Sequence, residues 1–338
     1  MKLKPFLKLF ENNQLAALVG VKTLLKPFYT LTYLAGAESS GLLRQLAGHP
    51  LTFDELARTF AINPKSREAL EAWLQLGLRL HLLALKNQKY ELKGLALKLA
   101  EPQNDAALAL LQEVATLHHK LVLCTPGRLK LDQPWSLADQ DGALTTRSSR
   151  TLEAFQHEAI DIHFPISGTT HLLEIGCGSA AYIKYAASRN PSLTALGLEL
   201  QIDVAELARK NIDQWGLQGK CRIETADIRE RTPEQLFEIA TLFNNIYYFP
   251  VADRINLLAH IMKFIRPGGF LLLTSCCQGG SLGVEALNLW GAATANAGRL
   301  PYRQEMVDQL YAAGFSAVQS MSLVPGDAFY SFKALVSP

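Results

Sequence analysis

The carboxyl-terminal half of the chain alternates between short apolar segments and longer amphipathic segments. The strand-length segments are 171–176, 193–199, 221–225, 239–246, 269–275, 317–323 and 329–336. The helix-length segments between them are 180–189, 203–215, 251–265 and 303–313. Strands joined through helices of this length form a parallel sheet that carries helices on both faces. The pattern therefore predicts an α/β domain over residues 166–338.

The first of these strands runs directly into a glycine turn, in the segment His171-Leu-Leu-Glu-Ile-Gly-Cys-Gly-Ser179. Gly176 and Gly178 allow the backbone to turn sharply and a ligand to approach it closely. Glu199 ends the next strand, where a carboxylate can accept both hydroxyls of a ribose, and Asp227 follows the third strand. The three strand ends together predict a site for a nucleoside-containing ligand.

Four motifs in this order resemble those of the class I S-adenosylmethionine-dependent methyltransferases. They are Glu174-x-Gly176-x-Gly178, Glu199, Asp227-Ile228 and Arg266-Pro-Gly-Gly269. The resemblance covers about residues 165–338 and implies a Rossmann-like catalytic domain that binds S-adenosylmethionine. A dinucleotide fits the motifs less well, because a carboxylate before the glycine turn repels a pyrophosphate and suits a cationic ligand.

The amino-terminal half reads as helix almost throughout and contains a helix–helix–hairpin pattern. Thr52 and Glu55 predict a capping box, and Asn63-Pro64 predicts the start of the next helix. A short hairpin over 81–93 follows. Two helices and a two-stranded wing describe a winged-helix module, so we expect residues 1–165 to form a mostly α-helical winged-helix-like domain.

With this amino-terminal domain, the chain resembles the dimeric small-molecule O-methyltransferases of secondary metabolism. The resemblance implies a homodimer formed through residues 1–165, which also cover the substrate, and O-methylation of a small metabolite. It assigns the cofactor to Glu174, Gly176, Gly178, Glu199, Leu200, Asp227, Ile228 and Asn244. It assigns the substrate to Asn245, Tyr248, Trp290 and Tyr330.

One position departs from this family, in which a histidine after the fourth strand serves as the general base. The matching segment here is Phe243-Asn-Asn-Ile-Tyr-Tyr-Phe-Pro250, and Tyr247 falls at the position of the histidine. A tyrosine is a poor base at neutral pH. His157 and His163, on the helix that enters the domain, are the alternative bases. The missing histidine leaves C- or N-methylation, for example of a 2-oxo acid, open as an alternative.

Charge and cysteine content limit the other classes of function. Lys plus Arg number 33 and Asp plus Glu 31, a formal net charge of +2, which gives no electrostatic case for nucleic acid. A winged-helix regulator that binds the cofactor as an effector stays the less favoured alternative. Five cysteines without C-x-x-C spacing indicate reduced thiols, and His118-His119 lacks metal-ligand spacing. We therefore expect a cytoplasmic enzyme with no metal, no membrane segment and no cleaved leader.

Overall fold

The computed structural model describes residues 4–61 and 63–338, and the chain divides into two compact units. The amino-terminal unit extends to Thr116 and the carboxyl-terminal unit runs from Leu117 to Pro338. The sequence places the boundary later, at residue 165. The difference arises because Leu121, Ile160 and Phe164 belong to the same buried cluster as Leu172 of the sheet.

The amino-terminal unit is a helical domain with a small three-stranded sheet. Its elements are α1 (Lys4–Glu11), α2 (Gln14–Ser39), α3 (Leu42–Gly48), β1 (Leu51–Thr52), α4 (Phe53–Phe60), α5 (Pro64–Arg79), β2 (Leu83–Lys86), β3 (Lys89–Leu92), α6 (Gly94–Leu99) and α7 (Asp105–Glu113). The sheet has the order β1-β3-β2 and is antiparallel. Thr52 and Glu55 form the expected capping box, and the Asn63 side chain caps α5. The predicted winged-helix pattern is confirmed.

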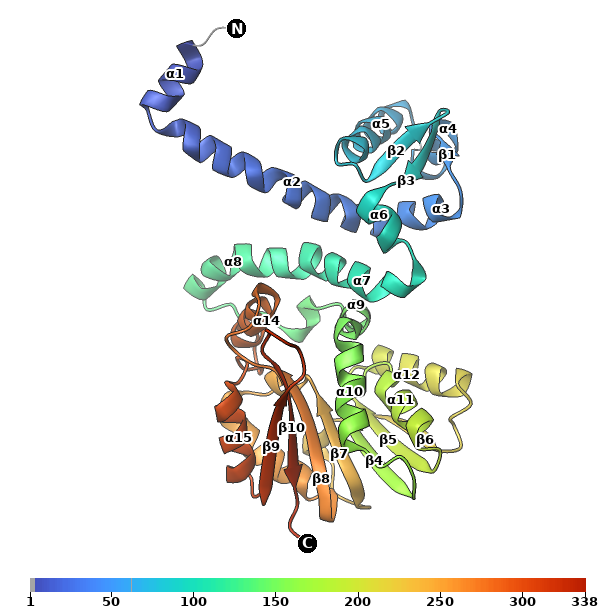
Figure 1. Ribbon diagram of the computed structural model, residues 1–338, viewed down its shortest axis with the longest axis vertical. Helices are drawn as coiled ribbons and strands as arrows, with labels where there is room; N and C mark the ends of the chain where they lie inside the picture. The colour runs from blue at the N-terminus through green and yellow to red at the C-terminus, as the bar shows by residue number, and fades with distance from the viewer. Residues whose placement is uncertain (1–3, 62) are drawn as a thin grey trace. The chain divides into compact units, whose positions relative to one another are not determined.

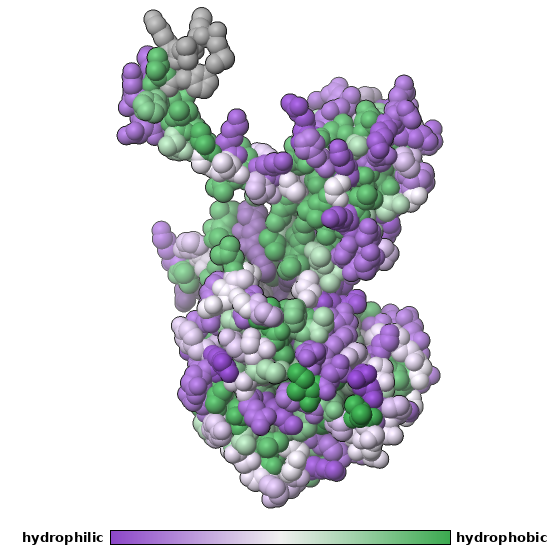
Figure 2. Space-filling model, in the orientation of Figure 1, coloured by the Kyte–Doolittle hydropathy of each residue, from purple (hydrophilic) through white to green (hydrophobic). Residues whose placement is uncertain are grey.

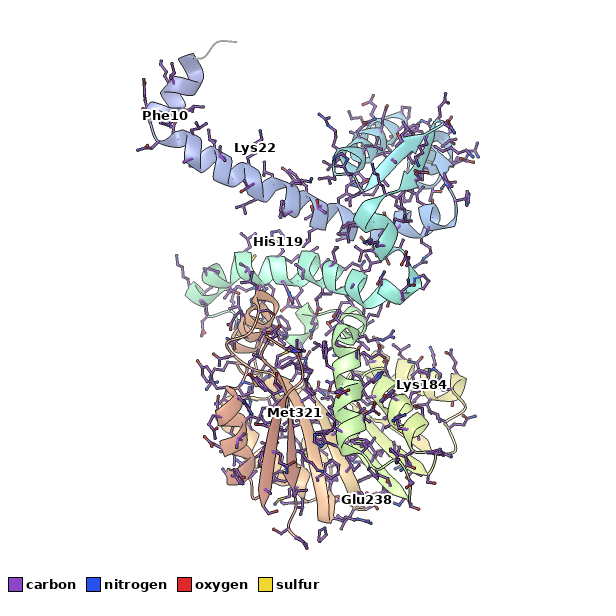
Figure 3. The ribbon with its side chains drawn as sticks, in the orientation of Figure 1. Phe10, Lys22, His119, Lys184, Glu238 and Met321 are labelled. Carbon is purple, nitrogen blue, oxygen red and sulfur yellow. The ribbon has the colours of Figure 1, made fainter. Side chains whose placement is uncertain are left out.

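Helices α1 and α2 expose an apolar surface (Figure 2). Leu24 on α2 is 68% exposed and Phe10 on α1 is 69% exposed, and the exposed side chains of Leu18, Val21 and Phe28 also lie on α2. Figure 3 labels Phe10 and Lys22 on this part of the chain. The amino-terminal unit by itself therefore leaves large apolar side chains in water, which is unusual for a surface that stays uncovered.

The carboxyl-terminal unit contains a seven-stranded sheet flanked by helices (Figure 1). Its helices are α8 (His119–Lys130), α9 (Gly142–Ser148), α10 (Glu153–His163), α11 (Ala181–Arg189), α12 (Ile202–Gln214), α13 (Arg254–Met262), α14 (Leu282–Ala293) and α15 (Arg303–Ala312). Its strands are β4 (Thr170–Ile175), β5 (Leu193–Glu199), β6 (Cys221–Thr225), β7 (Phe237–Phe243), β8 (Ile265–Cys276), β9 (Ala317–Ser322) and β10 (Phe329–Leu335).

The strand order is β6-β5-β4-β7-β8-β10-β9, and the first five strands are parallel. Strand β10 is inserted between β8 and β9 and runs antiparallel to both. The alternation of strands and helices predicts a parallel sheet, and this edge is antiparallel because β10 follows β9 through a short turn rather than a helix. A turn of a few residues can join only antiparallel strands.

The two faces of the sheet carry separate hydrophobic cores. Side chains of α10, α11 and α12 pack on one face, for example Ile160, Ile183 and Ala208. Side chains of α13 and α15 pack on the other, for example Leu258 and Leu310. The Rossmann-like fold class is confirmed. Because the chain crosses to opposite sides after β4 and β7, a crevice opens at the carboxyl ends of these neighbouring strands.

Helix α14 has no counterpart in the sequence prediction. Its segment, Leu282–Ala293, is apolar on most sides and has Glu285 as its single charged residue. Such a segment lacks the polar face by which an amphipathic helix is recognised in sequence. Trp290, expected in a loop on the substrate side, lies on this helix and is buried.

Candidate active site

A cavity of about 480 Å³ lies at the carboxyl ends of β4, β5 and β7. We call it the strand-end cavity. Residues at the ends of these strands and after β6 form one part of its wall. Residues of α9, α10, α11 and α12 and of the segments 136–140, 149–152, 247–249 and 295–296 complete it. A volume of this size suits a cofactor or drug-sized ligand.

The glycine turn after β4 forms the floor of the strand-end cavity. Gly176 and Gly178 have φ of 68° and 54°, values that glycine adopts readily. The Asn245 side chain holds the turn, because its Nδ2 donates to the carbonyl oxygens of Ile175 at 3.0 Å and Gly176 at 3.2 Å. A Cβ on residue 176 would collide with this amide. Asn245, predicted to bind substrate, lines the cavity, but the bonds of its amide are to the turn.

Glu199 ends β5 with its carboxylate oriented by two backbone amides. The N–H of Gly178 donates to Oε2 at 3.1 Å, and the N–H of Gln201 donates to Oε1 at 3.0 Å. The side chain is 8% exposed and lines the strand-end cavity. A carboxylate oxygen accepts more than one hydrogen bond, so both oxygens keep capacity for ligand hydroxyls.

Asp227 lies after β6 and is already engaged by its neighbour Arg229. The Arg229 Nε donates to both carboxylate oxygens at 3.0 Å, and its Nη2 donates to Oδ2 at 2.5 Å. These bonds hold the pKa of Asp227 below its ordinary value. Arg229 itself lines the cavity and lies 5.5 Å above the centre of the Phe249 ring. The sequence did not single out this arginine.

Glu174 lies inside β4 and is 1% exposed. Its Oε2 has no hydrogen-bond partner among the described residues. Burial, reinforced by the negative charge of Glu199, raises its pKa to about 8, although the amide of Ile183 opposes the shift. Glu174 does not itself line the strand-end cavity, but the buried unpaired oxygen lies two residues before its glycine floor.

The other residues assigned to the cofactor also lie at the strand-end cavity. Leu200, Ile228 and Asn244 line it. Asn244 has φ of 52°, and its Oδ1 accepts from the N–H of Cys276 at 3.1 Å, which joins the ends of β7 and β8. The carbonyl oxygen of Ile228 lies 2.9 Å from Nε2 of His260. These contacts fix the backbone around the cavity independently of any ligand.

Two tyrosines form the aromatic wall. Tyr247 is buried, Tyr248 is half-buried, and their ring centres lie 4.5 Å apart. The Tyr248 hydroxyl donates to Oε1 of Gln140 at 3.2 Å. Both rings line the strand-end cavity, in agreement with their predicted place.

The structure does not bring the two histidines into the strand-end cavity. The His157 ring stacks on Tyr185 at 3.6 Å, and burial lowers its pKa. It lines a separate cavity among α9, α10, α11 and α12. His163 ends α10 beside Lys333, and burial lowers its pKa also. Helix α10 instead presents Gln156 to the strand-end cavity, and Leu152, the residue before the helix, also lines it. Neither His157 nor His163 lines the strand-end cavity, so the structure does not place either of them beside a substrate there.

Two predicted substrate residues also lie elsewhere. Trp290 packs in the core with its ring centre 6.4 Å from that of Trp135. Tyr330 pairs with Ser275 across β8 and β10 and lies under the guanidinium of Arg303. Neither residue is part of the cavity wall. Their aromatic character and their expected place at strand ends or loops suggested the pocket, but in the structure both rings pack against other side chains.

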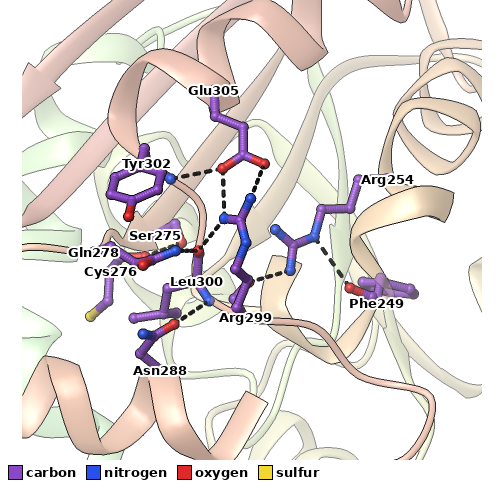
Figure 4. Close-up of polar contacts among 10 residues, drawn as sticks. All are labelled: Phe249, Arg254, Ser275, Cys276, Gln278, Asn288, Arg299, Leu300, Tyr302 and Glu305. Atoms are coloured by element: carbon purple, nitrogen blue, oxygen red, sulfur yellow. Dashed lines mark hydrogen bonds and ion pairs between the residues drawn. The ribbon is translucent and has the colours of Figure 1, made fainter. Parts of the chain in front are cut away.

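A buried arginine ties the wall residue Phe249 to Arg299, which lies outside the cavity wall (Figure 4). Arg254 is fully buried, and its Nε donates to the carbonyl oxygen of Phe249 at 3.2 Å. Its Nη2 donates to the carbonyl oxygen of Arg299 at 2.6 Å, and Arg299 forms a two-bonded ion pair with Glu305. Burial lowers the pKa of Arg254 to about 10. Sequence gave no signal for this network, because its members are far apart in the chain.

Within residues 4–61 and 63–338 there is no group of three or more His, Cys, Asp and Glu side chains arranged to hold a metal ion. In the same part of the chain, no helix combines the length and apolar character that crossing a membrane requires. All five cysteines are free thiols.

The residues of the strand-end cavity fit S-adenosylmethionine. Its ribose hydroxyls would meet a carboxylate already oriented by backbone amides, Glu199. Its cationic groups would lie near Glu174, whose Oε2 has no partner among the described residues, and their positive charge would favour the ionised form of this otherwise protonated carboxyl. A pyrophosphate would raise the pKa of this carboxyl further and would gain no charge pairing from it.

Comparison with known proteins agrees with this geometry. Residues 172–269 match the family model of a methyltransferase domain. The chain is 24% identical over 106 residues to malonyl-[acyl-carrier protein] O-methyltransferase 2 of Ilyobacter polytropus, a match that covers 31% of this chain and 39% of that protein. The match thus spans well under half the length of this relative.

Solved structures resemble nearly the whole chain. The mitomycin 7-O-methyltransferase MmcR superimposes with a TM-score of 0.79 at 16% identity, covering 97% of this chain and 100% of that one. Human N-acetylserotonin methyltransferase superimposes with a TM-score of 0.74 at 14% identity, covering 95% and 98%. At these identities the likeness establishes the fold.

The predicted resemblance to class I methyltransferases is confirmed. The carboxyl-terminal unit contains a methyltransferase domain of the class I, Rossmann-like fold, and S-adenosylmethionine is the cofactor of this class.

Proposed function

We propose that this protein transfers a methyl group from S-adenosylmethionine to an oxygen atom of a small metabolite. The observation that carries the proposal is the carboxylate of Glu199, which is nearly buried at the end of β5 and oriented by the amides of Gly178 and Gln201. The methyltransferase domain match and the O-methyltransferases among its structural relatives support it.

The side chains around the strand-end cavity would bind and orient rather than react. When bound, S-adenosylmethionine supplies an electrophilic methyl group on a positively charged sulfur. Glu199 would accept the ribose hydroxyls, Asp227 with Leu200 and Ile228 would enclose the adenine, and the glycine turn would admit the methionine portion. Glu174 would complement positive charge from beneath the turn. Holding two reactants in line contributes up to roughly 7–11 kcal/mol to a barrier reduction.

Oxygen is the preferred acceptor because the relatives named for a reaction are O-methyltransferases. A carbon or nitrogen acceptor, such as an enolisable 2-oxo acid or an amine, is the alternative. The cavity wall is compatible with this alternative, because the position of the family's histidine is occupied by Tyr247. His157 and His163 lie outside the cavity. A methyl acceptor that loses its proton easily needs no enzyme base.

Calorimetry with S-adenosylhomocysteine tests the cofactor assignment. Glu199→Ala should weaken binding at least about tenfold, because two hydrogen bonds to a charged acceptor are lost. Glu224→Ala is the matched control, since Glu224 is the penultimate residue of the neighbouring strand β6, pairs with Arg222 and Arg231, and does not line the cavity. Unchanged affinity in Glu199→Ala would refute the assignment.

The reaction itself is tested with isotopically labelled S-adenosylmethionine and host metabolite extract. The labelled product, located by mass spectrometry, gives both the substrate and the acceptor atom. A label on carbon or nitrogen would replace O-methylation by the alternative. Cofactor binding without turnover on any extract would indicate a protein that keeps the fold without the reaction.

A homodimer through the amino-terminal unit belongs to the same proposal. The exposed apolar side chains of α1 and α2, Phe10 and Leu24 among them, support it. Light scattering should report about twice the chain mass of 37.2 kDa. Leu24→Asp should yield monomers, whereas Leu282→Asp, at a 91% exposed position of the other unit, should not. A monomer at micromolar concentration for the unaltered chain would contradict the dimer.

We further propose that the protein does not bind nucleic acid and works in the cytoplasm. On α5 and the wing, Lys65 pairs with Glu68, Arg67 with Asp54 and Lys86 with Glu91, so three cations of this surface are already paired with carboxylates. Retention on heparin at low salt and binding of duplex DNA would favour the alternative, a winged-helix regulator. The free cysteines support a reducing compartment, which cell fractionation would check.

A further inference from the structure

Helix α10 places a buried carboxamide in the wall of the strand-end cavity. Gln156 is 1% exposed and lines the cavity. Its Nε2 donates to Oγ1 of Thr274 at 2.8 Å, and Thr274 on β8 is fully buried. Its Oε1 has no hydrogen-bond partner among the described residues. One end of the amide is therefore fixed in the protein, and the other end is a buried acceptor with no donor among the described residues.

A buried acceptor without a donor is costly, since it has given up water and received nothing. Tyr182, Phe243 and Tyr247 are further side chains of the same cavity wall. Apart from the charged residues at the strand ends, the described cavity wall contains one charged side chain, Arg150. Its Nη2 and Nε lie 3.0 and 3.1 Å from Oε2 of Glu153, which neutralises it. The surroundings of Gln156 thus suit an uncharged ring that carries a hydrogen-bond donor.

We propose that Gln156 positions the methyl acceptor by accepting a hydrogen bond from its hydroxyl or N–H group, while no protein side chain removes its proton. This inference rests on the proposed methyl transfer. The bond from the acceptor atom to the methyl carbon forms as the sulfur–methyl bond breaks, the sulfonium becomes a neutral thioether, and the acceptor's proton passes to water. A carboxamide oxygen is too weak a base to take that proton, but it can fix the direction of the O–H or N–H bond and hence of the lone pair that attacks.

Probe binding tests the hydrogen bond without knowledge of the substrate. Phenol and toluene have nearly the same shape, but only phenol donates a hydrogen bond. In the presence of saturating S-adenosylhomocysteine, the protein should bind phenol in preference to toluene by ligand-observed NMR titration. Gln156→Leu should reduce that preference about three- to tenfold, the value of one neutral hydrogen bond.

The chain offers a matched control in Gln309 on α15. Gln309 is also buried and also has an unpartnered Oε1, but it does not line the cavity. Gln309→Leu should leave the phenol preference unchanged, so that loss of a buried carboxamide in general is separated from loss of this one. Both variants should bind S-adenosylhomocysteine with wild-type affinity.

With the substrate found from labelled extract, Gln156→Leu should lower kcat/KM for the acceptor about three- to tenfold and leave the KM for S-adenosylmethionine unchanged. A phenol preference that persists in Gln156→Leu, or the absence of binding of either probe, would overturn the inference. A preference for anisole over ethylbenzene would also overturn the inference. Anisole accepts but does not donate a hydrogen bond, so this preference would show that the N–H₂ of the amide faces the ligand. If the probes bind as expected but no component of the extract is methylated, the proposed methyl transfer is refuted and the hydrogen-bonding role of Gln156 is still supported.

Discussion

Glu174 gives the sharpest prediction, because it is a carboxyl group kept protonated by its surroundings. Burial and the charge of Glu199 raise its pKa from 4.5 to about 8. In the unfolded chain the same group has its ordinary pKa and ionises near pH 4.5. Between these two values the folded protein holds a proton that the unfolded chain has lost, so the free energy of unfolding falls as the pH rises.

The magnitude follows from the two pKa values. Each pH unit in this range costs the folded state about 1.4 kcal/mol, so the loss between pH 4.5 and pH 8 reaches roughly 3–5 kcal/mol. Above pH 8 the group is ionised in both states and the loss stops growing. Glu174→Gln keeps the shape and cannot ionise. Its stability relative to the wild type should therefore increase by roughly 3–5 kcal/mol from pH 4.5 to pH 8.

Urea unfolding at pH 5, 6, 7 and 8, followed by tryptophan fluorescence, measures this difference. Trp135, Trp215 and Trp290 report on the carboxyl-terminal unit, and a Trp73→Phe background removes the signal of the other unit. Glu206→Gln, at an exposed position of α12, is the control and should show the pH dependence of the wild type. Parallel curves for the wild type and Glu174→Gln across this range would refute the reasoning.

Three further outcomes follow from the same geometry. Gly176→Ala should weaken S-adenosylhomocysteine binding at least about tenfold, because the left-handed backbone and the Asn245 amide both oppose a Cβ; calorimetry on the variant checks this, and wild-type affinity would contradict it. Tyr247→Phe should keep measurable turnover, losing about 1–2 kcal/mol of transition-state stabilisation, and turnover should survive EDTA; a dead variant with intact cofactor binding would assign the tyrosine an acid–base role. Arg254→Met should lower the free energy of unfolding by about 2–4 kcal/mol, because the carbonyl oxygens of Phe249 and Arg299 lose their hydrogen-bond donor. A change in melting temperature near zero would contradict this and would show that water replaces the arginine as donor.

The sheet and the cofactor side of the cavity were largely predictable from local sequence. Apolar runs of strand length predicted β5 and β6 at their observed bounds, 193–199 and 221–225. Glu199 and Asp227 reach the same cavity although 28 positions apart, because parallel strands bring their carboxyl ends to one edge. The strand positions and the meeting of these two carboxylates follow from the topology of the sheet, so the sequence predicts them without knowledge of side-chain packing.

The acceptor side was not predictable to the same extent, because it depends on which face of a helix turns inward. His157 and Gln156 are adjacent in sequence but point about 100° apart on α10, since a helix turns once every 3.6 residues. The sequence favoured the histidine for its chemistry, whereas packing against the sheet placed the glutamine at the cavity. Helix α14 was missed for a related reason, because it lacks a polar face.

The order in which the chain is synthesised conflicts with the order in which the sheet is assembled. Strand β10 is made after β9, yet it lies between β8 and β9 and pairs with both. Until Phe329–Leu335 has emerged from the ribosome, β8 presents an unpaired edge next to buried leucines such as Leu271 and Leu273. Exposed apolar edges of this kind pair readily with other chains. Interruption of synthesis before Phe329 would therefore leave an aggregation-prone nascent chain, and chaperone demand should be greatest for that length.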